Sequence, residues 1–272
     1  MTGGRHAEVR GEHPPLTLTG ERTLPGIAHE QYWFARHLVA YRHGAAVVGA
    51  HLPDSARTPS AVVLDAGCGE GYGADLIHRQ LDVPVVALDY DPTTVAHVRR
   101  AYDSVTPVRA NLVALPLRSG SCAALVSLQT VEHVWDQPAF LAECARVLEP
   151  GGVLVLSTPN RLTFSSAAGN PFHARELDAV ELLALVEPHF EQVRTLGVHH
   201  GPRLRSFAVA YGDPVAAQLA APPEDWDADL AHLVSSVEPD DFVVHRDSAH
   251  HRLVDALDLV LIAVAAGRGV EQ

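Results

Sequence analysis

Short apolar runs alternate with amphipathic segments over most of this chain. The runs are rich in Val, Leu and Ala and are bounded by Gly, Pro or Asp, as buried strands are, while the segments between them carry apolar residues at helical spacing. The pattern predicts, in chain order, strand 61–66, helix 72–81, strand 84–89, helix 92–102, strands 105–109 and 123–129, helix 137–148, strand 152–157, helix 178–187 and strand 190–197. Strands and helices in turn indicate an α/β fold with a doubly wound, mostly parallel sheet.

Two regions depart from this alternation. From Ile27 to Ala46 apolar residues recur at near-helical spacing before the sheet begins, which predicts an N-terminal helical cap over residues 24–50 that would cover a ligand cleft. Residues 202–256, approximately, mix Ala and Leu with several prolines and acidic residues, so we expect a helical insertion of short helices there. After it, the almost uncharged run from Leu257 to Ala265 predicts a buried last strand.

Domain organisation follows from composition. Residues 1–20 contain Gly, Pro and charge with little apolar periodicity, and we expect them to form a mobile tail. The chain length suits one α/β domain with additions, so residues 21–272 are predicted to form a single domain. A chain of this length can bury roughly 70–75% of its unfolded surface, so no metal or disulfide is needed to hold it together.

Four glycines join the first predicted strand to the first helix of the alternation. Gly67, Gly69, Gly71 and Gly73 remove Cβ atoms where the backbone must turn sharply or approach a ligand closely. Asp89 closes the next strand, where a carboxylate can accept hydrogen bonds from both hydroxyls of a ribose. The two features together predict a nucleoside site at the carboxyl edge of the sheet.

The spacing of the glycines discriminates among nucleoside sites. A dinucleotide fold requires G-x-G-x-x-G, and Tyr72 occupies the third glycine position of that fingerprint. A phosphate loop requires a lysine, and the chain contains none. A nicotinamide site and a purely structural glycine turn are left open as minor alternatives.

The net negative charge of the chain limits the classes of partner that it can bind. Its net charge is −13 at pH 7, whereas binding to nucleic acid depends on a basic surface. The sequence has no apolar stretch long enough to span a membrane and no secretory h-region. We therefore expect a cytoplasmic protein that acts on a small molecule or glycan, with neither nucleic acid nor membrane as partner. A homodimer through the insertion is left open.

Cysteine and histidine usage gives no metal site. Cys68, Cys122 and Cys144 are scattered in apolar runs and do not form C-x-x-C pairs, which favours reduced thiols in a cytoplasm. The pairs His199–His200 and His250–His251 have no carboxylate at ligand spacing. No metal site is predicted, and whether a divalent metal assists a reaction is left open.

Several motifs accumulate into a resemblance. The acidic-x-G-x-G-x-G pattern that begins at Asp65 resembles the first motif of the class I S-adenosylmethionine-dependent methyltransferases. A wider set of motifs is similar to the actinobacterial sugar O-methyltransferases associated with methylglucose lipopolysaccharide and other polymethylated polysaccharides. That set comprises residues 18–25, 30–34, 66–77, 131–137, 157–161, 170–173 and 200–205. The similarity runs from about residue 16 to residue 265.

The resemblance implies a fold and a cofactor. The fold would be a Rossmann-like sheet of seven strands, mostly parallel, whose antiparallel last strand lies beside the fifth. The cofactor would be S-adenosylmethionine, with Tyr32 and Arg36 closing over its methionyl end and the backbone of Leu112 facing its adenine ring. Asn111 stands where many of these enzymes carry an Asp that accepts a hydrogen bond from the adenine amino group, and its amide oxygen can still accept that bond.

The expected site divides into a donor side and an acceptor side. Ordinary structural roles remain open for several of these residues: a turn for Asn111, core packing for Tyr32 and a satisfied core position for His133. The cofactor is expected to contact Tyr32, Arg36, Asp65, Gly67, Gly69, Gly71, Asp89, Asn111, Leu112 and Gln129. The acceptor is expected to contact Glu132, Asn160, His173, His200 and Arg203.

The predicted reaction is methyl transfer to a hydroxyl of a sugar or polysaccharide precursor. His133 belongs to the segment that follows the fourth strand, and histidine is the one residue type that titrates near neutral pH without special tuning. It is expected to act as the base, with His173 as the substitute. Two alternatives remain: a C- or O-methyltransferase acting on a quinone or secondary metabolite, and a non-catalytic cofactor-binding module, because fold does not fix function.

Overall fold

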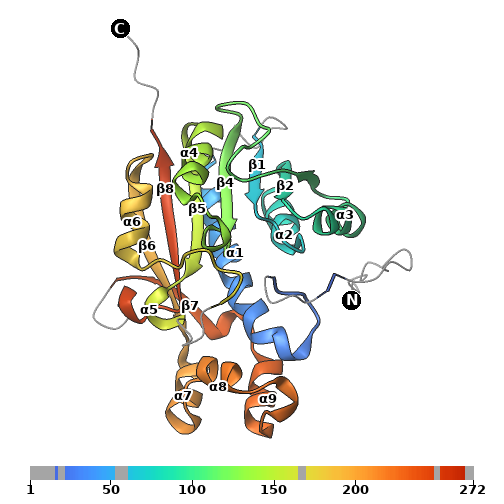
Figure 1. The fold of residues 1–272 in the computed structure, drawn as a ribbon, viewed down its shortest axis with the longest axis vertical. Coiled ribbons are helices and arrows are strands. Elements are labelled where there is room, and N and C mark those ends of the chain that lie inside the picture. Colours follow the sequence, from blue (N-terminus) through green and yellow to red (C-terminus); the bar gives the residue numbers. More distant parts are fainter. Residues whose placement is uncertain (1–15, 18–21, 53–60, 165–169, 248–251, 267–272) are drawn as a thin grey trace.

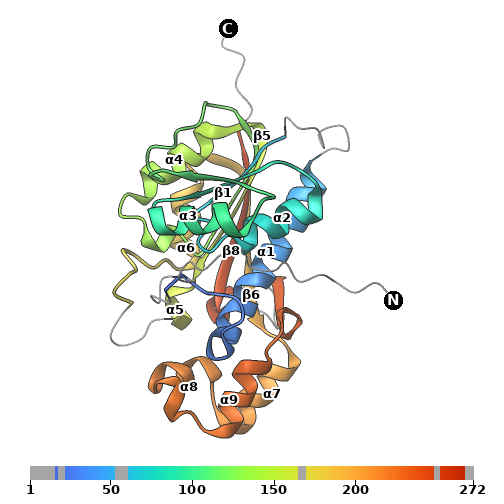
Figure 2. The same cartoon turned by 90° about the vertical axis from the view of Figure 1, so that its right-hand side faces the viewer.

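The fold is a central sheet with helices on both faces (Figures 1 and 2). The computed structural model describes residues 16–17, 22–52, 61–164, 170–247 and 252–266. The tail predicted over residues 1–20 lies outside the described residues, apart from Leu16 and Thr17. The predicted doubly wound α/β class, with a mostly parallel sheet, is confirmed.

The strands follow the predicted alternation closely. They are β1 (Val63–Ala66), β2 (Val85–Asp89), β3 (Thr106–Arg109), β4 (Cys122–Leu128), β5 (Leu148–Pro159), β6 (Phe190–His200), β7 (Phe242–Arg246) and β8 (Asp258–Ala265). Over the described residues they form one eight-stranded sheet in the order β3-β2-β1-β4-β5-β8-β6-β7. The pairs from β3 to β5 are parallel. The carboxyl ends of β1, β2 and β4 therefore meet at one edge.

The helices cover the sheet on both sides. They are α1 (Gln31–His51), α2 (Tyr72–Leu81), α3 (Pro92–Ala101), α4 (Gln137–Val147), α5 (Arg161–Phe164), α6 (Ala179–Val186), α7 (Pro202–Tyr211), α8 (Pro214–Ala220) and α9 (Ala228–Ser236). Figure 2 separates α1 and α2 on one face from α4 and α6 on the other. Strand residues divide accordingly: Val63 and Val126 pack toward the first pair, and Leu64 and Leu125 toward the second.

The far half of the sheet differs from the prediction by one strand. β8 lies antiparallel beside β5, with Ser157 opposite Val260, as the resemblance implies. β7 is additional and lies within the region predicted as a purely helical insertion. Apolar and polar residues do not alternate along its five residues, which follow Pro239 and two acidic residues, so the local sequence pattern does not predict a strand. Its pairing with β6, which sets Val198 opposite Val244, is a tertiary contact.

The predicted N-terminal cap is a short 3-10 helix, η1 (Ala28–Glu30), followed by α1. The second half of α1 is part of the hydrophobic core and does not only cover a cleft. Gly44 approaches Val155 of the sheet, and the ring of Tyr41 lies where a Cβ on Gly73 of α2 would sit. The first half of α1 continues to the carboxyl edge of the sheet. One helix therefore links the core to the edge where ligands bind in such folds.

The predicted helical insertion contains α7, α8 and α9, which form a group at the bottom of Figures 1 and 2. It is tied to the start of α1, because the side-chain amide of Gln31 donates to the backbone oxygen of Val237 (2.8 Å). Among the described helices, none is long and apolar enough to cross a membrane.

Candidate active site

The glycine turn between β1 and α2 is packed on one side and open on the other. Gly67, Gly69 and Gly71 have positive φ angles of 85°, 52° and 103°, which L side chains rarely adopt. A Cβ on Gly67 would lie 2.4 Å from the hydroxyl oxygen of Thr130, whereas a Cβ on Gly69 would meet nothing within 4 Å. The turn thus leaves its backbone accessible, as a ligand-binding loop requires.

Asp89 ends β2 beside this turn. Its two oxygens accept hydrogen bonds from the backbone N–H groups of Gly69 (3.1 Å) and Asp91 (2.9 Å), and burial raises its pKa. Each carboxylate oxygen has a second lone pair, so this half-buried group can accept further hydrogen bonds from a ligand. The cap of α3 is Asp91, which accepts from the N–H of Thr93 (2.8 Å), and Asp89 is outside that role.

Asn111 and Leu112 follow β3 at the same edge of the sheet. The preceding residue, Ala110, donates its backbone N–H to the backbone oxygen of Asp89 (3.0 Å). The side chain of Asn111 is exposed, and its amide oxygen accepts from the N–H of Val113 (3.1 Å) in a turn. The turn role is therefore present, and it leaves the amide NH2 and a second lone pair at the surface.

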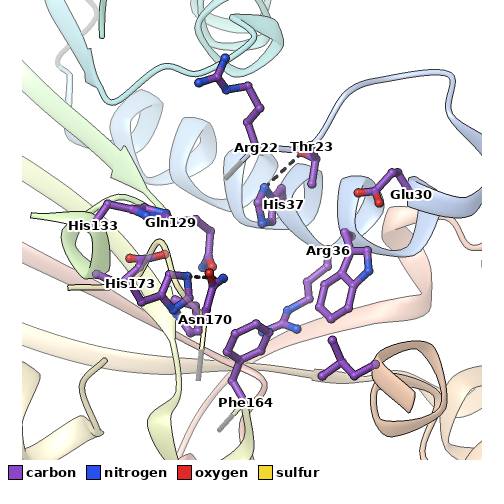
Figure 3. A pocket seen from close by; sticks show the side chains of 14 residues that line it. Arg22, Thr23, Glu30, Arg36, His37, Gln129, His133, Phe164, Asn170 and His173 are labelled. Atoms are coloured by element: carbon purple, nitrogen blue, oxygen red, sulfur yellow. Dashed lines mark hydrogen bonds between the residues drawn. The ribbon is translucent and has the colours of Figure 1, made fainter. Parts of the chain in front are cut away.

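A cavity of about 260 Å³ opens where α1 meets the ends of β4 and β5 (Figure 3). The segment before α1 lines a second side, and Phe164, Asn170 and His173 line a third. Its lining residues are Arg22, Thr23, Glu30, Trp33, Arg36, His37, Gln129, Glu132, His133, Pro159, Phe164, Asn170, His173 and Leu219. The fold thus brings five of the sequence-predicted polar residues into one cavity: Arg36, Gln129, Glu132, His133 and His173.

Glu132, His133 and His173 form a cluster on the cavity wall. Glu132 and His133 belong to a 3-10 helix, η3 (Val131–His133), that follows β4. The rings of His133 and His173 are 4.9 Å apart and nearly perpendicular, and one ligand atom from each of the three residues lies within 4.8 Å of the others. These side chains could hold a metal ion. The sequence reasoning missed this set because it considered only histidines adjacent in the chain; of the pairs it considered, His250–His251 lies outside the described residues.

Burial dominates the electrostatics of Glu132. Its side chain is 1% exposed, and its Oε2 accepts a hydrogen bond from the hydroxyl of Thr158 (3.0 Å). Burial penalises the charged form and raises the pKa of Glu132 to about 8. The backbone oxygen of the same residue accepts from the N–H groups of Ala174 (2.7 Å) and Arg175 (3.2 Å). This contact holds the segment that carries His173 against η3.

Arg36 lines the cavity with its charge already neutralised. Its Nε donates to Asp258 (2.6 Å), a second nitrogen of the guanidinium forms an ion pair with the same carboxylate, and the rings of Trp33 and Phe164 flank it at 5.5 and 5.8 Å. Burial opposes the charge of Arg36, but the attraction of Asp258 outweighs it and raises the pKa. A ligand carboxylate would have to share this guanidinium with Asp258.

The predicted residues of the glycine turn, Asp89, Asn111 and Leu112 lie outside the cavity lining, and five further predicted residues are also absent from it. Tyr32, Asp65 and Asn160 are fully buried, so they have no surface to offer a ligand. The Tyr32 hydroxyl shares a hydrogen bond with Nε2 of His200 (2.6 Å), and His200 is absent from the cavity lining. Arg203 is partly exposed at the insertion and pairs with Asp241 (2.6 Å).

The buried residues of this group have structural roles. The amide NH2 of Asn160 donates to the backbone oxygens of Leu253 (3.0 Å) and Ala256 (2.9 Å), which ties β5 to the segment before β8. Asp65 accepts from the hydroxyl of Tyr41 (3.3 Å to each oxygen), and burial raises its pKa to about 7. Asp65 thereby fixes α1 behind the glycine turn.

Sequence reasoning did not single out Trp33, His37 and Phe164 as cavity residues. His37 shares hydrogen bonds with the hydroxyls of Thr23 (3.3 Å) and Tyr72 (3.5 Å), and burial lowers its pKa to about 4, which keeps it neutral at pH 7. Helical spacing could have identified two of these residues. Trp33 and His37 are four residues apart on a helix and lie on the same face as the predicted residue Arg36.

The chain is similar to known methyltransferases along most of its length. Residues 64–156 match a family model described as a methyltransferase domain. A probable S-adenosylmethionine-dependent methyltransferase of Mycolicibacterium smegmatis is 47% identical over 256 residues, covering 92% of this chain and 95% of that protein. A protein of Mycobacterium tuberculosis with the same description is 44% identical and covers 96% of each. A ubiquinone biosynthesis O-methyltransferase of Xanthomonas campestris is 36% identical over 109 residues, 38% of this chain and 45% of that protein.

Solved structures of low identity share the fold. An S-adenosylmethionine-dependent methyltransferase of Thermotoga maritima, described as a possible histamine N-methyltransferase, aligns with a TM-score of 0.56 at 18% identity, over 86% of this chain and 92% of that one. A geranyl diphosphate methyltransferase in complex with S-adenosylmethionine aligns with a TM-score of 0.50 at 18% identity, over 83% and 84% of the two chains.

Proposed function

This chain belongs to the class I S-adenosylmethionine-dependent methyltransferases, and from that premise we propose that it methylates a hydroxyl of a sugar or polysaccharide precursor. The observation that carries the proposal is the position of Thr130. Its side chain fills the space beside Gly67 of the glycine turn, and the next residues form η3 with Glu132 and His133. The donor side and the acceptor side therefore adjoin at one residue.

The carboxyl edge of the sheet fits the cofactor of this family. The open space over Gly69 admits a close approach to the backbone, and the carboxylate of Asp89 beside it suits two ribose hydroxyls. We assign contact with the adenine amino group to Asn111. We place the boundary between donor and acceptor at Gln129, which follows β4, has a positive φ of 51° and lines the cavity. S-adenosylmethionine supplies, when bound, a methyl group activated by its positively charged sulfur.

The histidine cluster can remove the proton of an acceptor hydroxyl. A backbone carbonyl only accepts hydrogen bonds, so Nδ1 of His133 carries the proton that it donates to the oxygen of Phe172 (3.0 Å). The basic lone pair of the ring is then on Nε2. A positioned base of this kind contributes about 10²- to 10⁴-fold to the rate. We assign the base to His133, with His173 as its substitute.

The cavity combines aromatic faces with polar groups, as a carbohydrate acceptor requires. Trp33 and Phe164 line the cavity and supply aromatic surface against which the apolar side of a sugar ring can pack. Asn170 and Glu30 add an amide and a carboxylate for hydroxyl groups. The resemblance to sugar O-methyltransferases, which runs from about residue 16 to residue 265, supports the same acceptor class.

A quinol is the second acceptor class, favoured by the partial similarity to a ubiquinone biosynthesis O-methyltransferase. The two classes differ in acidity. A phenolic hydroxyl has a pKa near 10 and loses its proton more readily than an alcohol. Methylation of a quinol would therefore depend less on His133 than methylation of a sugar.

The test is a methyl-transfer assay on the purified chain, with panels of hexose oligosaccharides and of quinols and with product mass as readout. We expect a gain of one methyl on a hexose acceptor, a fall in kcat of about 10²- to 10⁴-fold in His133→Ala, and unchanged cofactor affinity. His232→Ala, an exposed histidine of the insertion, is the matched control. Products formed only from quinols would overturn the sugar assignment, and cofactor binding without any product would favour a non-catalytic module.

A further inference from the structure

The Glu132, His133 and His173 cluster has the chemistry of a metal site. Two imidazoles and one carboxylate form a donor set that proteins use for divalent transition-metal ions. One candidate ligand atom from each residue lies within 4.8 Å of the other two, and all three residues line the cavity, of which Figure 3 labels His133 and His173. An ion held there would face whatever occupies the cavity.

Hydrogen bonds set both imidazoles in the form that ligates a metal through Nε2. Nδ1 of His133 donates to the backbone oxygen of Phe172 (3.0 Å), and Nδ1 of His173 donates to the carboxylate of Glu176 (2.7 Å). Each ring then carries its lone pair on Nε2. Metal-binding histidines have this arrangement, in which the second nitrogen donates to a carbonyl or a carboxylate.

The orientation of Asn170 supports this assignment independently. Its Oδ1 accepts from the backbone N–H of Phe172 (3.0 Å), so its NH2 group faces Nε2 of His173 at 3.0 Å. An amide NH2 only donates, which requires a lone pair on that Nε2. The structure thus contains a hydrogen-bond donor at the position where a cation would bind to the ring.

Glu132 supplies the anionic ligand. Its carboxylate is 1% exposed and receives the hydroxyl of Thr158 at 3.0 Å on one oxygen. An ionised carboxylate at this depth is stable only when it is paired or coordinates a metal. The guanidinium of Arg36, which also lines the cavity, is already paired with Asp258.

We propose that Glu132, His133 and His173 bind one divalent first-row transition-metal ion, such as Zn²⁺, Mn²⁺, Fe²⁺ or Co²⁺. Metal–ligand bonds of about 2.1 Å place tetrahedral ligand atoms about 3.4 Å apart. The candidate ligand atoms lie within 4.8 Å of one another, so they approach by up to about 1.4 Å around the ion. The NH2 group of Asn170 turns away in the same step. Mg²⁺ and Ca²⁺ prefer sites made of oxygen ligands alone and are disfavoured here.

The role of the ion rests on the proposed function. Three protein ligands leave a coordination position open toward the cavity, as in catalytic metal sites. A cation there lowers the pKa of a hydroxyl that approaches it. In the metal-bound chain the Nε2 lone pairs of His133 and His173 bind the ion and the hydroxyl proton passes to water, whereas in the metal-free chain His133 accepts that proton. The site itself can be measured without the acceptor.

The test is a titration of the metal-free, full-length chain with Co²⁺, in the absence of cofactor and acceptor. We expect one Co²⁺ per chain, visible d–d absorption bands and their loss on addition of Zn²⁺. His173→Ala and the isosteric Glu132→Gln should each weaken Co²⁺ binding about 100-fold. Glu176→Gln keeps all three ligands but changes the partner of His173, and should weaken binding about 10- to 100-fold. His232→Ala should leave binding unchanged.

Two outcomes overturn the metal site: absence of visible bands at saturating Co²⁺, or identical binding by the wild type, His173→Ala and Glu132→Gln, which would indicate surface histidines only. Circular dichroism shows whether each variant is folded. If His173→Ala or Glu132→Gln does not fold, the Co²⁺ affinity of Glu176→Gln tests the metal site in its place. Failure of the proposed function gives a different result. Co²⁺ binding without methyl transfer to a sugar would overturn the sugar acceptor and leave the metal site in place. Methyl transfer to a sugar without Co²⁺ bands would overturn the metal site and leave the sugar acceptor in place.

Discussion

At the scale of single residues, two buried carboxylates lie near the ends of neighbouring strands. Asp65 is in β1 and Glu132 follows β4, and burial raises their pKa values to about 7 and about 8. Sequence motifs identify both positions, but they do not distinguish their surroundings. Asp65 has no exposed surface and bonds to Tyr41, whereas Glu132 reaches the wall of the cavity.

The raised pKa of Asp65 predicts a pH-dependent stability. Its ordinary value is 3.8 and its value in the folded chain is about 7, so its contribution to stability is present below about pH 4 and is lost as the pH rises through 7. Relative to Asp65→Asn, the wild type should therefore lose melting temperature between pH 5 and pH 8. Thermal unfolding without ligand measures this difference.

Tyr41→Phe is the companion variant for that experiment. The hydroxyl of Tyr41 lowers the pKa of Asp65, so its removal should shift the loss of stability to higher pH. Parallel pH profiles for the wild type and Asp65→Asn would contradict the prediction.

Residue roles were predictable from the sequence only where the partner is local. The cap of α3 by Asp91 is an example, because donor and acceptor are two residues apart. Arg36 is the opposite case, since its partner Asp258 is 222 residues away in the chain. A buried arginine at a predicted ligand cleft therefore looks like a ligand contact until the packing of α1 against β8 is known.

At the scale of elements, the predicted boundaries are accurate where glycine, proline or a cap marks them. Helix α2 runs from Tyr72 to Leu81 as expected, and α3 begins at Pro92. Strand β7 has no such signal and forms because β6 offers it a free edge, which no local pattern encodes. The cavity residues on α1 could not be predicted from a local pattern either, because the direction of that helix depends on its contact with α2.

The contact between α1 and α2 predicts a cost for enlarging Gly73. A Cβ at this position would lie 2.1 Å from the ring of Tyr41, so Gly73→Ala forces the two helices apart. Overpacking of this kind costs about 1–3 kcal/mol, which exceeds the gain of up to about 1 kcal/mol in helix propensity. Chemical denaturation should show a lower free energy of unfolding.

Gly44→Ala is the matched control within α1. A Cβ there would lie 3.4 Å from Val155, an ordinary contact, so helix propensity should decide and stability should be unchanged or slightly higher. Combining Gly73→Ala with Tyr41→Leu should recover part of the loss. Equal effects of the two glycine substitutions would count against close approach of the helices as the cause.

At the scale of the whole molecule, the cavity joins segments that are far apart in the sequence. Its wall combines the first half of α1, the end of β4 and the segment that carries His173, while the glycine turn lies next to it across Thr130. Binding at this junction should therefore stabilise the entire domain.

S-adenosylmethionine is expected to raise the melting temperature of the chain. At a concentration of 100 times its Kd, a ligand that binds only the folded state adds about 2.7 kcal/mol, which corresponds to several degrees for a chain of this size. Asp89→Ala should lose most of that shift, because charged hydrogen bonds to the ribose are worth about 1.5–3 kcal/mol each. Asp240→Ala, at a side chain that is 95% exposed, should retain the full shift. An equal shift in both variants would remove Asp89 from the cofactor site.

The residues that line the cavity come from two parts of the chain. The segment that matches the methyltransferase domain, residues 64–156, contains the glycine turn, Asp89 and η3. Trp33, Phe164 and His173 lie before or after it. Substitutions at these three positions would therefore change the cavity wall and leave the proposed cofactor contacts within residues 64–156 unchanged.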